Sequence, residues 1–179
     1  MAAYSEAPAR DEYRDFYAGY VARVPPGDVV ATLRDQLDGT LELVAGMSER
    51  QADFAYAPGK WTIKQVLGHL SDTERVMSAR ALCFARGEQA PLPAFDENAY
   101  VDNAGFEQRT LDSLVQELRA VRAASLALFD GLSPEAWTRR GTASGHGITV
   151  RALAWVIVGH ELHHRAILEE RYVSTAKAG

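Results

Sequence analysis

The sequence predicts an all-α protein, a four-helix bundle. Four segments repeat apolar residues at three- and four-residue spacing, which is the period of a helix with one buried face. Helix-start residues such as Asp28 and Thr62 precede these segments, and no segment shows the two-residue alternation of a strand. Four such helices bury their apolar faces against one another around one core. We therefore expect one bundle domain at residues 28–173.

The first helix is expected to begin after Asp28 and to end at Gly46. Asp28 can cap the free amides of the first turn. The residues before it, 1–27, end in Pro25-Pro26-Gly27, which cannot continue a helix. We expect residues 1–27 to form an arm or a short helix. The apolar stripe of the first helix consists of Val29, Leu33, Leu37, Leu41 and Val44.

The other three helices are predicted in the same way. Thr62 and Gln65 form a capping-box pattern at the start of the second helix, and Gly87 is the expected stop. The predicted bounds are 62–86 for the second helix, 110–129 for the third and 149–172 for the fourth, with 174–179 as a C-terminal tail.

The connection between the second and third helices, residues 87–109, is long for a compact domain. A crossover that leaves these helices parallel must run back along a helix of about 24 residues, roughly 36 Å at 1.5 Å per residue. At roughly 3.3 Å per extended residue the connection is long enough. Up-down-up-down order needs only short loops, so the long crossover favours up-down-down-up.

Composition and charge exclude several classes of protein. The 179 residues are 47% hydrophobic, enough for one domain with a buried core, and the net charge of −5 argues against a nucleic-acid-binding surface. The densest apolar run, 152–158, is too short to span a membrane, and no leader is recognisable. The single cysteine, Cys83, cannot form an internal disulfide. We expect a cytoplasmic protein with no nucleic-acid or membrane partner.

Two histidines stand in the middle of the apolar stripe of the fourth helix. His160 and His164 are one helical turn apart, so both rings project from one face. Burying them without partners would cost a few kcal/mol each. Either buried carboxylates or hydroxyls satisfy them, or the pair binds a metal ion, which we favour because imidazole suits Zn, Ni, Cu and Fe.

A third nitrogen ligand is expected from His69 on the second helix. In up-down-down-up order the second and fourth helices are antiparallel, which places His69 level with His164. Asp72 can hydrogen-bond a ligand histidine, or it is an exposed helix carboxylate. His146 and His163 are expected to be solvated. Because ligand histidines must be neutral, we expect metal affinity to fall below about pH 6.5.

The segment from His160 to His164 also matches H-E-x-x-H, the zinc-protease helix in which the glutamate is the general base. The longer form of that motif fails, because Leu168-Glu169-Glu170 stands where a glycine and a third histidine are required. On a helical wheel Glu161 lies at the margin of the stripe. We therefore expect it to contact a neighbouring helix or to support a ligand histidine, with general base as the alternative.

Three segments resemble the DinB-like family, also described as YfiT-like metal-dependent enzymes. Residues 59–75 (GKWTIKQVLGHLSDTER) are similar to its second-helix signature, residues 92–97 (LPAFDE) to its loop, and residues 159–165 (GHELHHR) to the end of its fourth helix. The resemblance covers nearly the whole chain, from about Val29 to Tyr172.

The resemblance implies an up-down-down-up bundle, often dimeric, with one divalent metal held by His69, His160 and His164. The family includes transferases that use low-molecular-weight thiols such as bacillithiol or mycothiol, and relatives described as hydrolases or isomerases. Membership of a fold does not fix the substrate.

Three neutral nitrogen ligands leave positions open on a metal ion, as in a catalytic site. We expect Zn or Ni, with an acidified thiol or water as nucleophile, which suits S-transfer and hydrolysis equally. The expected partners are a small-molecule substrate and a second copy of the chain in a homodimer. The alternative from another class is a non-enzymatic, metal-stabilised dimerisation module. The crossover should either form a wall of the substrate site or merely pack against the bundle. The residues that would do so are Phe95, Asp96, Asn98 and Tyr100.

Overall fold

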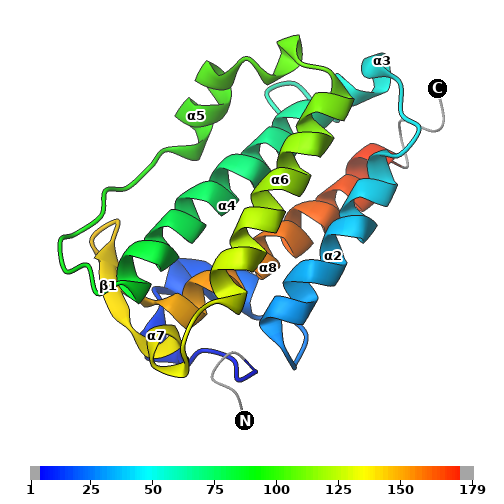
Figure 1. Ribbon diagram of the computed structural model, residues 1–179. Helices are drawn as coiled ribbons and strands as arrows, with labels where there is room; N and C mark the ends of the chain where they lie inside the picture. The colour runs from blue at the N-terminus through cyan, green and yellow to red at the C-terminus, as the bar shows by residue number, and fades with distance from the viewer. Residues whose placement is uncertain (1–4, 174–179) are drawn as a thin grey trace.

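The computed structural model describes residues 5–173. The predicted tail 174–179 and the first four residues of the predicted arm lie outside this range. Figure 1 shows α2 rising, α4 and α6 descending and α8 rising, which confirms the all-α bundle in up-down-down-up order. The four long helices are α2 (Val29–Val44), α4 (Ile63–Ala85), α6 (Leu111–Asp130) and α8 (Val150–Ile167).

Side-chain caps fix where the long helices begin. The Asp28 carboxylate accepts hydrogen bonds from two amides of the first turn of α2. Thr62 and Gln65 form a reciprocal capping box on α4. The hydroxyls of Thr110 and Thr149 each accept from the amide three residues ahead, on α6 and α8. All four starts agree with the prediction, because each depends on local chemistry that the sequence displays.

The crossover contains regular structure that sequence periodicity does not reveal. It forms α5 (Glu97–Ala104), capped by Asp96, and a 3-10 turn, η3 (Phe106–Gln108). Eight residues are too few to show a sustained apolar period. The Phe106 ring packs against Gly68, where a Cβ would lie 2.4 Å from ring atoms. This contact holds the crossover against α4 beside the site.

The expected absence of strands is wrong for one short hairpin. β1 (Arg140–Ala143) pairs antiparallel with β2 (His146–Thr149). The turn residues Ser144 and Gly145 have φ of 54° and 77°, as a tight two-residue hairpin turn requires. Leu92 of the crossover hydrogen-bonds to this hairpin. Four-residue strands with glycines do not produce a recognisable alternation, so the sequence does not predict them.

The N-terminal segment packs along α8. Its Glu12 carboxylate accepts hydrogen bonds from Thr149 and Arg151 at the start of α8. Further along, the Tyr20 backbone passes so close to Gly159 that a Cβ there would lie 2.1 Å from the Tyr20 carbonyl oxygen. The segment is therefore fixed over the middle of α8. It consists of η1 (Arg10–Glu12), η2 (Asp15–Tyr17) and α1 (Ala18–Val21).

Three short elements complete the described structure. Pro134 occupies the first position of α7, where its missing amide costs no hydrogen bond. A π-helical turn extends α8, so the fourth helical segment reaches its predicted end. No helix within residues 5–173 is long and apolar enough to cross a membrane. These elements are α3 (Glu49–Ala52), α7 (Pro134–Thr138) and η4 (Leu168–Val173).

A polar layer crosses the middle of the bundle between two apolar clusters. Phe84 and Leu153 belong to one cluster, and Leu67 and Leu118 to the other. Burial of such side chains stabilises the fold by about 1.5–3 kcal/mol each. The polar residues of the middle layer are also buried, so they require partners of their own. They include Gln36, Thr40, His69, Glu74, Arg122, His160, Glu161 and His164.

Candidate metal centre

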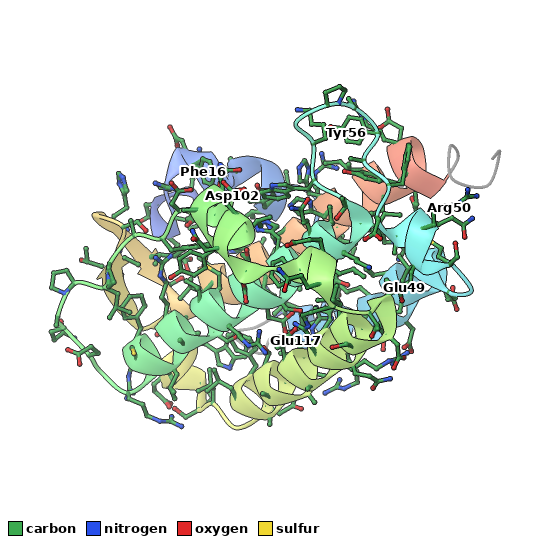
Figure 2. The ribbon with its side chains drawn as sticks, turned by 90° about the horizontal axis from the view of Figure 1, so that it is seen from above. Phe16, Glu49, Arg50, Tyr56, Asp102 and Glu117 are labelled. Carbon is green, nitrogen blue, oxygen red and sulfur yellow. The ribbon has the colours of Figure 1, made fainter. Side chains whose placement is uncertain are left out.

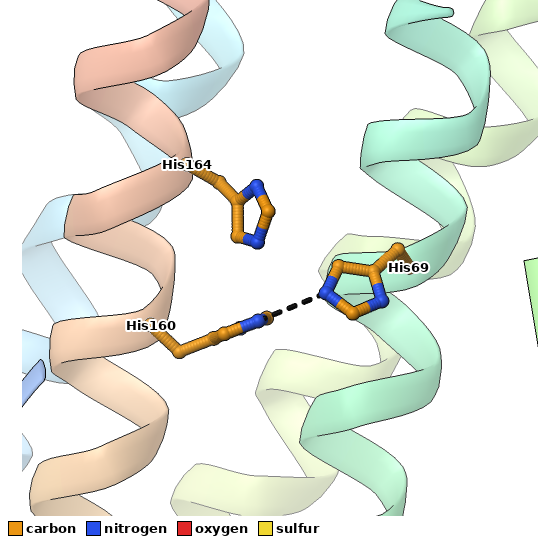
Figure 3. Close-up of side chains that lie close together, drawn as sticks. All are labelled: His69, His160 and His164. Atoms are coloured by element: carbon orange, nitrogen blue, oxygen red, sulfur yellow. Dashed lines mark hydrogen bonds between the residues drawn. The ribbon is translucent and has the colours of Figure 1, made fainter. Parts of the chain in front are cut away.

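Three histidines from two antiparallel helices meet inside the bundle (Figure 3). His69 lies on α4, and His160 and His164 lie one turn apart on α8. One ring nitrogen of each lies within 4.8 Å of those of the other two. The Nε2 atoms of His69 and His160 are 2.9 Å apart. These three residues, 5%, 7% and 9% exposed, are the ones that the sequence singles out.

Burial keeps the three imidazoles neutral. Loss of hydration lowers the pKa of His69 to about 4 and that of His164 to about 3. The pKa of His160 also lies well below its ordinary value, first through burial and then through the neighbouring rings. At neutral pH each ring therefore has an unprotonated nitrogen, the state in which imidazole binds a metal ion.

Protein hydrogen bonds do little to satisfy the cluster. The Nδ1 atom of His69 has Thr73 Oγ1 as a distant partner at 3.4 Å. Between two neutral rings only one of the facing Nε2 atoms of His69 and His160 can donate. Asp72, expected either to hydrogen-bond a ligand histidine or to be an exposed helix carboxylate, pairs with Arg75 on the same helix. Three converging neutral nitrogens are a donor set that fits a divalent ion such as Zn or Ni.

Glu161 turns toward α2 and α6. Its carboxylate accepts hydrogen bonds from Gln36, from Thr40 at 2.7 Å and from Arg122. Arg122 also pairs with Glu74 at 2.9 Å, and all these side chains are buried. The expected contact with a neighbouring helix is confirmed. Because donors occupy both oxygens of Glu161, this carboxylate is poorly placed to accept a proton from a ligand at the histidines.

A cavity of about 200 Å³ opens onto all three histidines. The N-terminal segment, the crossover, α4 and α8 supply its walls. Tyr20 meets His160 edge to face with ring centroids 5.4 Å apart, and Trp61 packs on His69 at 4.6 Å. The cluster is thus bounded by aromatic rings and also borders a cavity of small-molecule size.

A second cavity, of about 220 Å³, approaches from the other side of Trp61. It reaches His164 and is lined in part by Tyr56, Lys60 and Asn98. Figure 2 shows Tyr56 on the same edge of the molecule as Phe16, a residue that lines the first cavity. Each cavity therefore has a lining residue on this edge of the molecule.

The four crossover residues predicted to wall the site have different positions. Phe95 lines the first cavity and Asn98 the second. Asp96 caps α5 through its carboxylate. Tyr100 is 46% exposed and touches Phe95, with ring centroids 5.4 Å apart. The crossover therefore contributes to both cavities, and only part of the predicted set faces them.

Several cavity residues escape sequence reasoning. Arg14 and Tyr20 come from the N-terminal segment, whose docking on α8 depends on the long-range Gly159 contact. His163, expected to be solvated, is half-buried, lines the cavity and packs on Tyr20. His146 is exposed, as expected. The cluster of tyrosines at the N-terminus is the one sequence signal that could have indicated a packed segment.

Comparisons with known proteins agree with this architecture. The model of the DinB superfamily matches residues 32–168. A protein of Geobacillus thermodenitrificans (strain NG80-2) named "Putative metal-dependent hydrolase" is 21% identical over 139 residues, which cover 76% of this chain and 78% of the relative.

Two solved structures share the fold. YfiT from Bacillus subtilis, described as a probable metal-dependent hydrolase with an unusual four-helix bundle topology, superposes with a TM-score of 0.71 at 20% identity, covering 97% of this chain and 94% of YfiT. The mycothiol-dependent maleylpyruvate isomerase gives a TM-score of 0.68 at 15% identity, covering 83% of this chain and 62% of the isomerase.

Proposed function

This chain belongs to the DinB superfamily, and we propose that it is a metal-dependent enzyme that transfers a low-molecular-weight thiol to a small electrophile. One observation carries the proposal: a cavity of molecular size reaches all three histidines. A closed structural site would have no such access. The metal-dependent hydrolase and the mycothiol-dependent isomerase among the relatives support metal and thiol chemistry on this fold.

His69, His160 and His164 would hold one divalent ion. Such an ion supplies a Lewis acid that lowers the pKa of a thiol or water bound to it. The chain supplies the surroundings. Trp61 and Tyr20 pack against the histidine rings and limit their rotation. The three rings are less than a tenth exposed, and electrostatic interactions are stronger in such a low-dielectric setting.

Thiol transfer is favoured over hydrolysis with Glu161 as base. Both oxygens of the Glu161 carboxylate already accept hydrogen bonds, from Arg122, Gln36 and Thr40 on neighbouring helices, so it is poorly placed for proton transfer at the histidines. A thiolate nucleophile, in contrast, requires no general base once the proton has left the sulfur.

Hydrolysis is a second candidate, because one carboxylate does line the cavity. Glu97, at the start of α5, is the acidic member of the described lining. It could accept a proton from water at the histidines. Loss of a hydrolytic activity in Glu97→Gln, with thiol transfer absent in the parent, would favour this candidate.

The non-enzymatic alternative receives less support. A metal that stabilised a dimer would be expected at the surface, with ligands shared between copies. Here three ligands come from one chain, and all three are at least nine-tenths buried.

A thiol-consumption assay tests the proposal. The metal-loaded protein is incubated with cysteine, bacillithiol or mycothiol and a panel of small electrophiles, and free thiol is measured over time. With at least one combination of thiol and electrophile, we expect the parent protein to consume thiol faster than the uncatalysed reaction. His164→Ala should not exceed the uncatalysed rate. Equal rates for the parent and His164→Ala across the panel would contradict thiol transfer.

A further inference from the structure

Arg14 enters the cavity with a guanidinium that no acidic side chain neutralises. It lies over the rings of Phe16 and Tyr17, at 4.4 and 5.0 Å from their centroids. Its buried Nε atom has no hydrogen-bond partner, and no ion pair within residues 5–173 joins Arg14 to a carboxylate. The two rings hold the cation in place without supplying the acceptors that its donors require.

A second guanidinium adds positive charge beside the cavity. Arg80 is 4% exposed, and its Nη2 atom donates to the Pro93 carbonyl at 2.7 Å and to Ser144 Oγ at 3.0 Å. These partners are neutral, so the buried charge is not cancelled. Ser144 lines the cavity, and its own hydroxyl proton is left for another acceptor.

Arg14 and Ser144 lie on segments of the chain that contact each other. The hairpin that carries Ser144 contacts the N-terminal segment, because Arg140 of β1 donates to the carbonyl of Asp11. The cavity wall formed by Arg14, Ser144 and, behind it, Arg80 therefore combines unsatisfied donors with two guanidinium charges, against one carboxylate, Glu97, in the described lining. A low-dielectric wall of this kind concentrates anions.

We propose that this wall binds the carboxylate of an organic substrate whose remaining atoms extend toward the three histidines. The inference rests on the proposed function for the reaction, and it adds the substrate class. A guanidinium has the planar fork that matches a carboxylate. A cavity of about 200 Å³ limits the substrate to a small molecule.

The space between the carboxylate and the histidines is aromatic. The Phe16 ring lies beside the Arg14 guanidinium. The ring centroids of Phe16 and Tyr20 are 6.2 Å apart, and those of Tyr20 and His160 are 5.4 Å apart. Two rings thus bridge from the guanidinium to the nearest histidine. This wall suits the apolar part of a substrate whose anionic end is fixed at Arg14.

Benzoate and its neutral counterpart benzamide are suitable probes, because they differ in charge and hardly in shape. Binding of each is measured by calorimetry to the metal-free and the metal-loaded protein. We expect benzoate to bind more tightly than benzamide in both forms, and Arg14→Gln to weaken benzoate roughly tenfold or more while leaving benzamide unchanged.

Three further variants control this experiment. Arg14→Lys should keep part of the preference for benzoate, since it retains the charge. Arg50→Gln removes an exposed arginine on α3 that does not line the cavity, and it should change neither affinity. Glu97→Gln removes the cavity carboxylate and should tighten benzoate.

Three results would overturn the proposal: an unchanged preference for benzoate in Arg14→Gln, an equal loss of both probes, or a loss in Glu97→Gln that matches Arg14→Gln. The last would show that Arg14 serves to pair with Glu97. Because Arg14-dependent binding is also measured in the metal-free protein and without thiol, its presence in a protein that lacks thiol transfer would count against the proposed function alone.

Discussion

Glu161 illustrates how a residue beside a candidate metal ligand can serve the fold. Its bonds to Gln36 and Thr40 tie α8 to α2, and its bond to Arg122 ties α8 to α6. Arg122 lies between the carboxylates of Glu74 and Glu161, and together they raise its pKa against the effect of burial. The network fixes α8, and with it the positions of His160 and His164.

The Glu161→Gln variant should therefore unfold more easily than the parent while keeping most of its activity. Removing one carboxylate from Arg122 should lower the free energy of unfolding by about 1–3 kcal/mol. Metal should be retained, and thiol transfer at matched metal occupancy should stay within roughly tenfold of the parent, whereas loss of a general base costs about 10²–10⁴-fold. Glu170→Gln, at an exposed position, is the control. A loss of roughly a thousandfold with metal bound would restore Glu161 as the base.

The buried histidines predict how the metal-free protein responds to pH. His69 has a pKa of about 4 when folded and an ordinary value of about 6.5 when unfolded. Between these values the unfolded chain binds a proton that the folded chain does not, so stability is full above pH 6.5 and falls as the pH drops toward 4.

Urea unfolding at pH 7.5, 6, 5 and 4.5 measures this effect. His69 alone should account for a loss of roughly 3 kcal/mol across its full window. His69→Ala should flatten the dependence, and His146→Ala, at an exposed position, should not. A metal-free protein with the same stability at pH 7 and pH 5 would contradict neutral, buried rings.

The same shifts correct the expected pH dependence of metal affinity. An ordinary imidazole would begin to release metal below about pH 6.5. With the pKa of His69 at about 4 and that of His164 at about 3, protons compete only in more acidic solution. Affinity should therefore stay nearly constant from pH 7.5 to 5 while the protein is folded, and titration with Zn²⁺ at these pH values tests it.

Among the elements, α1 occupies a position that a single methyl group would disturb. Gly159 leaves room for the Tyr20 backbone, and a Cβ would lie 2.1 Å from its carbonyl oxygen. Gly159→Ala should therefore displace α1 and lower the free energy of unfolding by about 1–3 kcal/mol. Gly19→Ala is the matched control, because nothing lies within 4 Å of its Cβ. Equal unfolding free energies for the two variants would show that the contact is unimportant.

The prediction of elements succeeds where the signals are local. The caps at Asp28 and Thr62 and the apolar stripes identify the long helices, and the length of the crossover indicates the parallel order of α4 and α6. The hairpin at 140–149 and α5 are too short for a period. The docking of α1 depends on contacts across about 140 residues, between Tyr20 and Gly159, which no local pattern contains.

The candidate site shows the same division between local signals, which the sequence displays, and long-range contacts, which it does not. His160 and His164 are visible because two polar rings interrupt an apolar stripe, and His69 follows from the antiparallel pairing of α4 and α8. The second layer of interactions is less accessible to sequence. Thr73 Oγ1 lies 3.4 Å from the His69 Nδ1 atom, whereas Asp72 pairs with Arg75. Which side chain faces the ring depends on rotamers, which the sequence does not show. Arg14 is found only once the N-terminal segment is placed.

For the whole molecule, a homodimer stays a prediction. All three histidines of one cluster belong to one chain, so a second copy is not needed to complete it. We expect light scattering to give twice the mass of the chain both before and after treatment with a chelator. Dissociation on chelation, with the protein still folded by circular dichroism, would instead favour a metal-stabilised dimerisation module.

Metal content measures the central claim most directly. Elemental analysis of the purified protein, of His69→Ala and of His160→Ala, with His146→Ala as the exposed control, gives the number of divalent ions per chain. We predict one ion in the parent and in the control, and no tightly bound ion in the other two, because each loses one of three converging nitrogens. One equivalent of tightly bound metal in both His69→Ala and His160→Ala would contradict the assignment.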